Sequence, residues 1–311
     1  MSFRKALIPL PTHIIGVLNP PFVWYDHLMP HIYVNGRLIE TSRATVPALD
    51  RGLLYGYGLF ETMRSYGGRV FRLEEHYRRL CEGAAVLDLP PALTLDDLRV
   101  AVDALLERNG LADAYLRLTV TAGPTPDDGG ASPSVLLVAR PLSGYPSALY
   151  RRGMAAVTSA TRRNETSPLS RVKSLNYLDN LLAREEARRR GADEAILLNT
   201  RGLVAEGSAS NVFLVGSEGL STPSIESGAL PGITRATVIE LAREAGIACA
   251  EGEVEATTLA GAAEAFLTNS IMEVMPLTRL DGRAVGGGGP GPTTRAIRHL
   301  YDQAVARETA R

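Results

Sequence analysis

Hydrophobic and polar residues alternate with two different periods along this chain, and together they predict a mixture of strands and helices. Residues 31–39 alternate around Asn35-Gly36, a pair that favours the tight turn of a β-hairpin. Residues 73–87 repeat apolar positions with helical spacing, which predicts an amphipathic helix. The other elements predicted before residue 141 are a glycine-punctuated apolar run over residues 52–64, a hairpin turn at residues 67–68, a capped helix over residues 94–108, and strands over residues 114–121 and 134–140.

The second half of the chain follows a stretch rich in proline and glycine at residues 141–146, which predicts a linker between domains. A loop that holds Lys173 leads into a helix, which Gly191 ends. The elements predicted after the linker are strands over residues 154–161, 194–199, 204–215 and 264–270, and helices over residues 176–190, from 227–235 to about 246, and over 292–307.

Strands and helices follow one another without a long series of βαβ units, so the predicted fold class is α+β, or mixed α/β. The length of 311 residues suggests two domains. The predicted division is an N-terminal extension over residues 1–29, a small α/β domain over 30–140, an interdomain linker over 141–149 and a larger domain over 150–311. Prolines in the extension break a signal-peptide core, which leaves either an ordered arm or a true start at Met29.

Composition excludes several function classes. A hydrophobic content of 45% and a net charge of -1 describe a globular protein, and scattered charges argue against binding of nucleic acid or membranes. Cys81 and Cys249 are too few for a disulfide framework and lack the spacing of metal ligands, so we predict a reducing cytoplasm and no metal site. No apolar run is long enough to span a membrane.

Lysine is rare in this chain, where Lys5 and Lys173 are the only two. A Schiff base requires a primary amine that can lose its proton, whereas the guanidinium group of arginine stays protonated. Lys173 precedes a predicted helix that carries Tyr177, a side chain able to hydrogen-bond a cofactor or to tune the amine. The competing interpretations are a surface lysine and a tyrosine that packs in the core.

Three further segments carry candidate chemistry. Glu206 lies in an apolar strand, where a carboxylate requires a cationic partner such as a protonated pyridine nitrogen or an arginine. Residues 228–235 place glycines before Ile-Thr at a helix start, which suits phosphate, or else Thr234 simply caps the helix. The small polar residues 268–270 complete a phosphate cradle or cap a turn.

Taken in this order, these segments resemble the class IV fold of pyridoxal-phosphate enzymes. That family includes branched-chain aminotransferases, D-amino-acid aminotransferases, (R)-selective amine transaminases and aminodeoxychorismate lyases. The resemblance implies fold type IV, with a small N-terminal α/β domain, a larger domain with a barrel-like sheet, and a homodimer whose active sites lie near the interface. It covers residues 31–299 and rests on residues 50–62, 173–177, 206–211, 230–235 and 268–270.

The resemblance also implies roles for individual residues. Lys173 would form a Schiff base with pyridoxal phosphate and move protons, and Glu206 would keep the pyridine nitrogen protonated. Phe60 and Thr62 would line the substrate pocket. The remaining implied cofactor-binding residues are Arg79, Tyr177, Ser208, Asn211, Leu230, Ile233, Thr234, Asn269 and Ser270, and Arg162 and Arg163 are either ligands of a substrate carboxylate or surface arginines.

The implied reaction is transamination between an amino acid (D- or branched-chain) or an (R)-primary amine and a 2-oxo acid such as 2-oxoglutarate or pyruvate. The alternative is a 4-amino-4-deoxychorismate lyase that releases pyruvate and p-aminobenzoate. Residues 121–128 lack both the Arg-x-His motif of D-amino-acid enzymes and the arginine-rich loop of lyases, although residues 60–62 resemble those two branches. Residues 276–282 and 289–292 resemble aminotransferases. A silent relative would have lost Lys173 or Glu206, and both are present.

Overall fold

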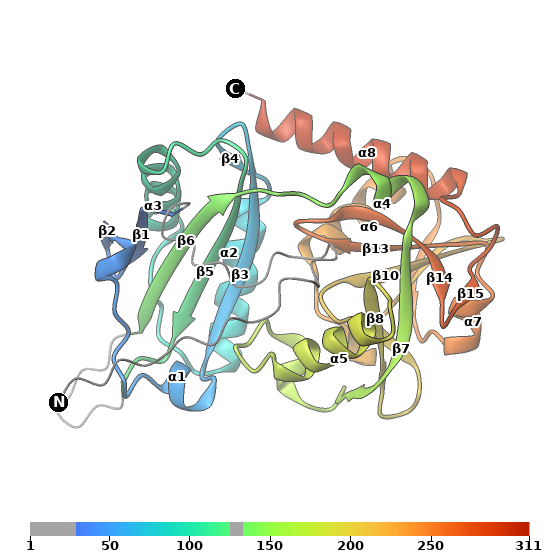
Figure 1. Cartoon of the computed structure of the whole chain (residues 1–311), viewed down its shortest axis with the longest axis horizontal. Helices are drawn as coiled ribbons and strands as arrows, with labels where there is room; N and C mark the ends of the chain where they lie inside the picture. Colours follow the sequence, from blue (N-terminus) through green and yellow to red (C-terminus); the bar gives the residue numbers. More distant parts are fainter. Residues whose placement is uncertain (1–28, 125–132, 311) are drawn as a thin grey trace, which may run out of the picture.

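A computed structural model describes residues 29–124 and 133–310, in which the chain forms two β-sheets that lie side by side (Figure 1). The first sheet has six strands in the order β2-β1-β6-β5-β3-β4. Its strands are β1 (His31–Val34), β2 (Arg37–Glu40), β3 (Gly58–Tyr66), β4 (Arg69–Val70), β5 (Ala114–Thr121) and β6 (Ser134–Pro141).

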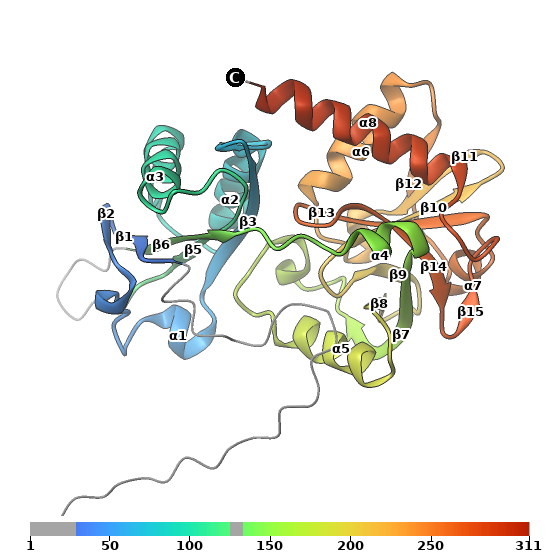
Figure 2. The same ribbon diagram turned by 45° about the horizontal axis from the view of Figure 1, so that its top comes forward.

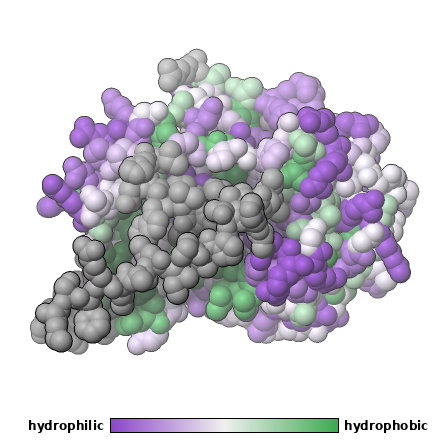
Figure 3. All heavy atoms as spheres, viewed as in Figure 1, coloured by the Kyte–Doolittle hydropathy of each residue, from purple (hydrophilic) through white to green (hydrophobic). Residues whose placement is uncertain are grey.

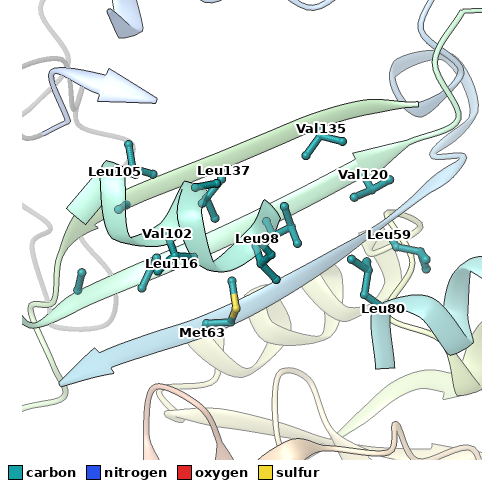
Figure 4. Packing of buried hydrophobic residues seen from close by; sticks show 14 of the residues in the cluster. Leu59, Met63, Leu80, Leu98, Val102, Leu105, Leu116, Val120, Val135 and Leu137 are labelled. Carbon is teal, nitrogen blue, oxygen red and sulfur yellow. The ribbon is translucent and has the colours of Figure 1, made fainter. Parts of the chain in front are cut away.

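Helices α2 (Leu73–Val86) and α3 (Leu95–Arg108) cover one face of the first sheet. Leu98 of α3 points toward Leu116 and Leu137 of the sheet, and all three side chains are fully buried (Figure 4). Burial of such leucine side chains stabilises the fold by roughly 2 kcal/mol each. This apolar layer fixes the orientation of the sheet and leaves its opposite face free for other contacts.

The opposite face of the first sheet points toward the second sheet. Because side chains alternate along a strand, Leu59 and Met63 of β3 join the core beneath the helices, whereas Phe60 and Thr62 face the other way. The pairing of β3 with β5 sets Thr62 opposite Arg117. Aromatic, hydroxyl and cationic side chains therefore share this face.

The second sheet has nine strands and curls into a half-barrel. Strand β7, the first of these strands along the chain, runs parallel to both of its neighbours, β8 and β14. The strands are β7 (Met154–Arg163), β8 (Glu194–Asn199), β9 (Val204–Gly207), β10 (Asn211–Gly216), β11 (Gly219–Pro223), β12 (Cys249–Gly252), β13 (Glu264–Asn269), β14 (Glu273–Leu280) and β15 (Arg283–Ala284).

Helices cover both sides of the second sheet, as the turned view shows (Figure 2). Helix α5 (Leu178–Arg189) packs on β7 and β8, whereas α6 (Ile233–Glu244) and α8 (Pro292–Thr309) lie on the other side. Beneath them the rings of Phe213 and Phe266 stack with centroids 4.9 Å apart. The shorter helices are α1 (Arg51–Tyr55), α4 (Ser147–Arg152) and α7 (Ala256–Ala260), and the 3-10 turns are η2 (Thr41–Arg43), η3 (Pro168–Arg171) and η4 (Ile225–Ser227).

The predicted mixed fold class is confirmed, but one predicted strand is wrong. Residues 204–215 form two strands, because the N–H of Gly207 donates to the carbonyl of Ser210 at 2.6 Å and closes a turn between them. Strands β11, β12 and β14 and helix α7 were not predicted. Strand β14 contains Pro276, a residue that argues against a strand, and β12 is a partly exposed strand at the edge of the sheet. The predicted extension lies, except for Met29, outside the described residues, among which no helix is long and apolar enough to cross a membrane.

Candidate active site

A cavity of about 450 Å³ lies between the two sheets. Its walls come from the free face of the first sheet, the loop around Lys173, the start of α5, the turn between β9 and β10, the start of α6 and the end of β13. The predicted functional residues that line it are Phe60, Thr62, Arg79, Arg163, Lys173, Tyr177, Glu206, Ser208, Asn211, Leu230, Ile233, Thr234, Asn269 and Ser270. Segments far apart in the sequence therefore meet in one place.

The loop that carries Lys173 is fixed by the first sheet through backbone hydrogen bonds. The N–H of Phe60 donates to the carbonyl of Lys173 at 2.9 Å, and the N–H of Leu175 donates to the carbonyl of Gly58 at 2.9 Å. Gly58 permits this approach because a Cβ there would lie 2.8 Å from Cδ1 of Leu175 in the loop. The position of the lysine therefore depends on both sheets.

The amine of Lys173 is buried next to an aromatic ring, with Nζ 4.4 Å from the centroid of Phe60. Burial, assisted by the positive charge of Arg79, lowers the pKa of Lys173 to about 8, although Glu61 and Glu206 oppose this shift. About a tenth of the amine is therefore neutral at pH 7, and about half at pH 8. Only this neutral form can attack a carbonyl carbon.

Glu206 is a buried carboxylate at the end of β9 that meets one cation and one backbone donor. Its Oε1 lies 3.3 Å from Nε of Arg163, and its Oε2 accepts from the N–H of Leu230 at 2.9 Å. Burial raises the pKa of Glu206, and the charge of Arg163 counters this effect. The arginine partner considered from the sequence is therefore present, and the same carboxylate also lines the cavity.

Tyr177 stands at the start of α5, where its ring meets the ring of Phe60 edge to face with centroids 5.3 Å apart. Its hydroxyl donates to the carbonyl of Ser208 at 2.9 Å, and Nδ2 of Asn180 donates to the same oxygen at 2.9 Å. Burial, with a contribution from Glu206, raises the pKa of Tyr177 above its usual range. The phenol is therefore neutral and acts as a hydrogen-bond donor to the turn.

The first turn of α6 faces the cavity with Ile233 and Thr234. Gly232, at the N-cap, offers no side chain to the free N–H groups of this turn. Nδ2 of Asn211 donates to the carbonyl of Leu230 at 2.9 Å and so fixes the loop that enters the helix. Free N–H groups and the helix dipole make this end a suitable binding site for an anion such as phosphate.

Arg79 reaches the same end of the cavity from α2, where a carboxylate that the sequence analysis overlooked holds it. Glu61 accepts from Nε of Arg79 at 2.8 Å and from Nη2 at 2.5 Å, and Nδ1 of His76 donates to it at 2.7 Å. Burial favours the protonated form, but Arg79 and His76 outweigh it and lower the pKa of Glu61 to about 2. Nη1 of Arg79 donates to the carbonyl of Pro231 at 2.9 Å.

The end of β13 adds small polar groups. Nδ2 of Asn269 donates to the carbonyl of Ala209 at 2.8 Å, and its Oδ1 accepts from the N–H of Ile271 at 2.9 Å. Ser270 lies beside these groups on the cavity wall. Oγ1 of Thr268 is buried and has no hydrogen-bond partner in the described structure, although it lines the cavity. An unpaired buried hydroxyl of this kind is consistent with a site that a polar ligand completes.

The face of the first sheet supplies a cation that the sequence analysis also missed. Arg117 lines the cavity from β5, with its guanidinium carbon 3.9 Å from the centroid of Phe60. It forms no ion pair with an acidic side chain within residues 29–124 and 133–310. The alternation of β5 was the signal, because it places Tyr115 and Arg117 on the face opposite the apolar core.

The structure separates Arg162 from Arg163, which the sequence presented either as ligands of a substrate carboxylate or as surface arginines. Neighbouring residues of a strand point to opposite faces, so one of the two turns away. Arg163 lines the cavity, but it pairs with Glu206 and donates to the carbonyl of Gly228 at 3.2 Å. Nη1 of Arg162 donates to the carbonyl of Ser159 at 2.9 Å, and Arg162 is not part of the cavity wall.

The cavity matches the requirements of pyridoxal phosphate. A phosphate-sized anion suits the free N–H groups of α6 beside Arg79, a protonated ring nitrogen suits Glu206, and an aldehyde carbon suits the amine of Lys173. The volume of about 450 Å³ lies within the usual range for cofactor and small-ligand sites.

Comparison with known proteins supports this match. The family model of class IV amino-transferases matches residues 58–280. The chain is 38% identical over 276 residues to a putative branched-chain-amino-acid aminotransferase of Methanocaldococcus jannaschii, covering 87% of this chain and 94% of that protein. It is 34% identical over 284 residues to a D-alanine aminotransferase of Bacillus licheniformis, covering 90% and 99%.

A solved structure agrees in fold. The branched-chain amino acid aminotransferase of Thermobaculum terrenum in its pyridoxal-phosphate form aligns with a TM-score of 0.80 and 33% identity, over 89% of this chain and 94% of that one. These relatives favour the predicted transaminase over the alternative lyase. The chain belongs to the class IV aminotransferases and is a pyridoxal-phosphate-dependent aminotransferase of fold type IV.

Proposed function

We propose that this enzyme transfers the amino group of a branched-chain L-amino acid to a 2-oxo acid such as 2-oxoglutarate. The observation that carries the proposal is one cavity that contains a buried amine of lowered pKa, a buried carboxylate and an arginine without an acidic partner among the described residues. Similarity to branched-chain aminotransferases supports a branched-chain amino donor. The D-alanine relative, at similar identity, makes D-amino acids the competing donor class.

Lys173 has two tasks in this proposal. Pyridoxal phosphate, when bound, supplies a carbonyl that reacts with amines and a ring that withdraws electrons from the substrate Cα. Nζ of Lys173 would hold that carbonyl carbon in the resting enzyme. Once a substrate amine takes its place there, Nζ would be free to take the proton from Cα and to return it elsewhere, which its pKa of about 8 permits.

Glu206 and Arg163 form the part of the proposed site that would face the ring nitrogen of the cofactor. The carboxylate of Glu206 would hold a proton on the ring nitrogen, because a negative charge in a buried site favours a cationic partner. Arg163, 3.3 Å away, and the N–H of Leu230 keep the carboxylate oriented. Leu230 lies beside this pair on the cavity wall and would pack against the ring face.

The anionic end is proposed to lie at the start of α6. The N–H groups of Ile233 and Thr234, the guanidinium of Arg79 and the hydroxyl of Ser270 would bind the phosphate. Glu61 fixes the guanidinium through two hydrogen bonds, so Arg79 is already oriented before the anion arrives. Ser208 in the turn after β9, Asn211 at the start of β10 and Asn269 at the end of β13 would hold the surrounding backbone.

Arg117 is our candidate for the substrate carboxylate. It projects from β5 into the cavity beside Phe60, and Thr62 is its partner on the neighbouring strand β3. Phe60 supplies an apolar surface for a branched side chain. Arg117→Gln is expected to raise KM for the 2-oxo acid by roughly 10- to 100-fold, because a charge-assisted hydrogen bond contributes about 1.5–3 kcal/mol.

An exposed apolar patch supports the proposed homodimer. Leu53 of α1 is 67% exposed and Leu178 of α5 is 65% exposed, and Nδ2 of Asn176 donates to the carbonyl of Gly56 to join the two segments. Hydrophobic atoms gather along the lower edge of the molecule in Figure 3, where Figure 1 places α1 and the start of α5. The other exposed members of this patch are Leu49, Leu54, Tyr55, Leu181 and Leu182.

Ultracentrifugation tests the dimer. Leu53→Asp and Leu178→Asp are expected to shift the protein toward the monomer, because a charge in an apolar interface is poorly solvated. Val100→Asp is the matched control, since Val100 is 69% exposed on α3, away from this patch. A wild-type monomer, or a dimer unaffected by either leucine variant, would refute the patch as the interface.

A reducing cytoplasm remains our proposed compartment. Cys81 is exposed and both Cys81 and Cys249 are free thiols, which suits a reducing environment. Cell fractionation of the source organism tests this. Recovery with a secreted fraction would contradict it.

The donor class is tested by glutamate formation from 2-oxoglutarate. We expect L-leucine, L-isoleucine and L-valine to support turnover at least tenfold better than D-alanine or (R)-1-phenylethylamine. Turnover with D-alanine alone would replace the proposed donor. Release of pyruvate from 4-amino-4-deoxychorismate, with no glutamate from any donor, would instead indicate the lyase.

A further inference from the structure

Glu194 is a buried carboxylate to which the proposed mechanism gives no role. It lies on β8 and is only 3% exposed. Its Oε1 accepts from the N–H of Ala195 at 2.8 Å, from the N–H of Ser208 at 3.2 Å and from the hydroxyl of Ser208. Its Oε2 accepts from the hydroxyl of Ser210 at 2.9 Å. Within residues 29–124 and 133–310 it forms no ion pair, so these hydrogen-bond donors are its polar partners.

These bonds hold the turn that joins β9 to β10. Glu194 contacts both ends of the turn through Ser208 and Ser210, and the N–H of Gly207 closes it by donating to the carbonyl of Ser210 at 2.6 Å. A Cβ at Gly207 would lie 2.1 Å from Oγ of Ser210, so only glycine fits against the Ser210 hydroxyl at this position. The carbonyl of Ser208 is therefore held at a fixed point on the cavity wall.

The carbonyl of Ser208 is the acceptor for the hydroxyl of Tyr177. A phenol has a single O–H proton, and here that proton points at Ser208 at a distance of 2.9 Å. The oxygen of Tyr177 consequently offers only lone pairs to the cavity. Nδ2 of Asn180 donates to the same carbonyl and limits its movement from the side of α5.

We propose that Glu194 is a positioning residue, which through Ser208 directs the hydroxyl proton of Tyr177 away from the cavity and makes the phenol oxygen an acceptor toward the bound cofactor. The inference rests on the proposed role of Tyr177 beside the cofactor. When the Glu194 carboxylate is removed, the carbonyl of Ser208 moves, and the phenol of Tyr177 donates into the cavity instead. A donor and an acceptor at that place favour opposite protonation states of the neighbouring cofactor atoms.

The protonation of the bound cofactor is measured directly by its visible absorbance as a function of pH. In the holoenzyme, Glu194→Ala is expected to shift the midpoint of this titration by about one pH unit, a tenfold change in proton affinity. Glu194→Gln retains an acceptor for the N–H groups and is expected to shift it less. Glu264→Gln is the matched control, because Glu264 is also buried and accepts from the N–H groups of Thr293 and Thr294.

A double-mutant cycle with Tyr177→Phe assigns the pathway. If Glu194 acts through the phenol, Glu194→Ala produces less than a threefold change in proton affinity when Tyr177 is already phenylalanine. An undiminished shift in that background, or an equal shift in Glu264→Gln, would overturn the inference. A Tyr177→Phe enzyme that titrates like the wild type would instead refute the proposed role of Tyr177.

A second measurement covers variants that bind the cofactor weakly. In the apoenzyme of Glu194→Ala, crystallography is expected to show the Tyr177 hydroxyl separated from the carbonyl of Ser208 by more than hydrogen-bond distance. An unchanged Tyr177–Ser208 bond in that variant would overturn the inference without any cofactor present.

Discussion

The N–H of Phe60 donates to the carbonyl of Lys173 at 2.9 Å. A strand of the first sheet therefore holds a lysine that belongs to a loop of the second sheet. An isolated bridge between Leu59 and Ser174 extends the same contact. The amine of Lys173 thereby stays beside the Phe60 ring, 4.4 Å from its centroid. The relative position of the two sheets is consequently part of the chemistry, because it sets where the amine lies.

Gly58 tests this dependence. A Cβ at Gly58 would lie 2.4 Å from the carbonyl oxygen of Val120 and 2.8 Å from a methyl group of Leu175, so Gly58→Ala must displace the strand or the lysine loop. We expect a loss of roughly 1–3 kcal/mol of unfolding free energy, measured in urea, and slower reconstitution with pyridoxal phosphate. Gly252→Ala, with no atom within 4 Å, is expected to change neither. Equal behaviour of the two variants would contradict the close approach.

The lowered pKa of Lys173 predicts the pH dependence of its reactivity. A group with a pKa of about 8 is mostly neutral above that pH, whereas an ordinary lysine stays charged to about 10.5. Acylation of the apoenzyme at Lys173, followed by mass spectrometry, should therefore rise with a midpoint near pH 8. Unfolded protein is the control and should show the ordinary value. The experiment is clean because Lys5 is the only other lysine.

Glu61 predicts a contribution to stability that depends on pH. Its folded pKa of about 2 lies below the ordinary 4.5, so the unfolded state binds the proton more tightly. The stabilisation is complete above pH 4.5 and is lost as the pH falls toward 2, with a size of roughly 3 kcal/mol. Glu61→Gln is expected to abolish this pH dependence in urea unfolding. Glu40→Gln removes an exposed ion pair with Arg43 and should have almost no effect.

Two variants separate the structural and catalytic parts of the Glu206–Arg163 pair. Glu206→Gln still accepts from the N–H of Leu230 but cannot hold a proton on the ring nitrogen as a carboxylate. We expect kcat to fall on the order of 100-fold. Arg163→Met removes the cation beside Glu206, together with the hydrogen bonds of Arg163 to the carbonyls of Gly228 and Ser170, and should reduce kcat by less than about tenfold. If both variants reduce stability alike and leave kcat unchanged, Glu206 serves only as an ion-pair partner.

The sequence indicated those parts of the site that lie in continuous segments. Lys173 was conspicuous as a rare lysine, and Ile233 and Thr234 follow a glycine at a helix start. Glu61, Arg117 and Glu194 were missed because their meaning arises only when distant segments meet. Nothing near Glu194 in the sequence shows that Ser208 will donate to it.

Strand alternation accounts for the remaining differences between sequence and structure. It allows only one of Arg162 and Arg163 to face the cavity, and the pairing with Glu206 identifies Arg163 as that residue. The turn after Glu206 split a predicted strand because glycine and two serines there bond to one another and to Glu194. Local propensity does not reveal such tertiary hydrogen bonds.

The most direct test of the account is a half-reaction with purified holoenzyme and no 2-oxo acid. On addition of L-leucine, the visible absorbance of the lysine-bound cofactor should disappear as the pyridoxamine form accumulates. Addition of 2-oxoglutarate should then restore it. Lys173→Ala should neither show the lysine-bound band nor complete the exchange. If the wild-type band persists with L-leucine, L-glutamate, D-alanine, D-glutamate and (R)-1-phenylethylamine alike, the cavity around Lys173 is not the site of amino-group transfer.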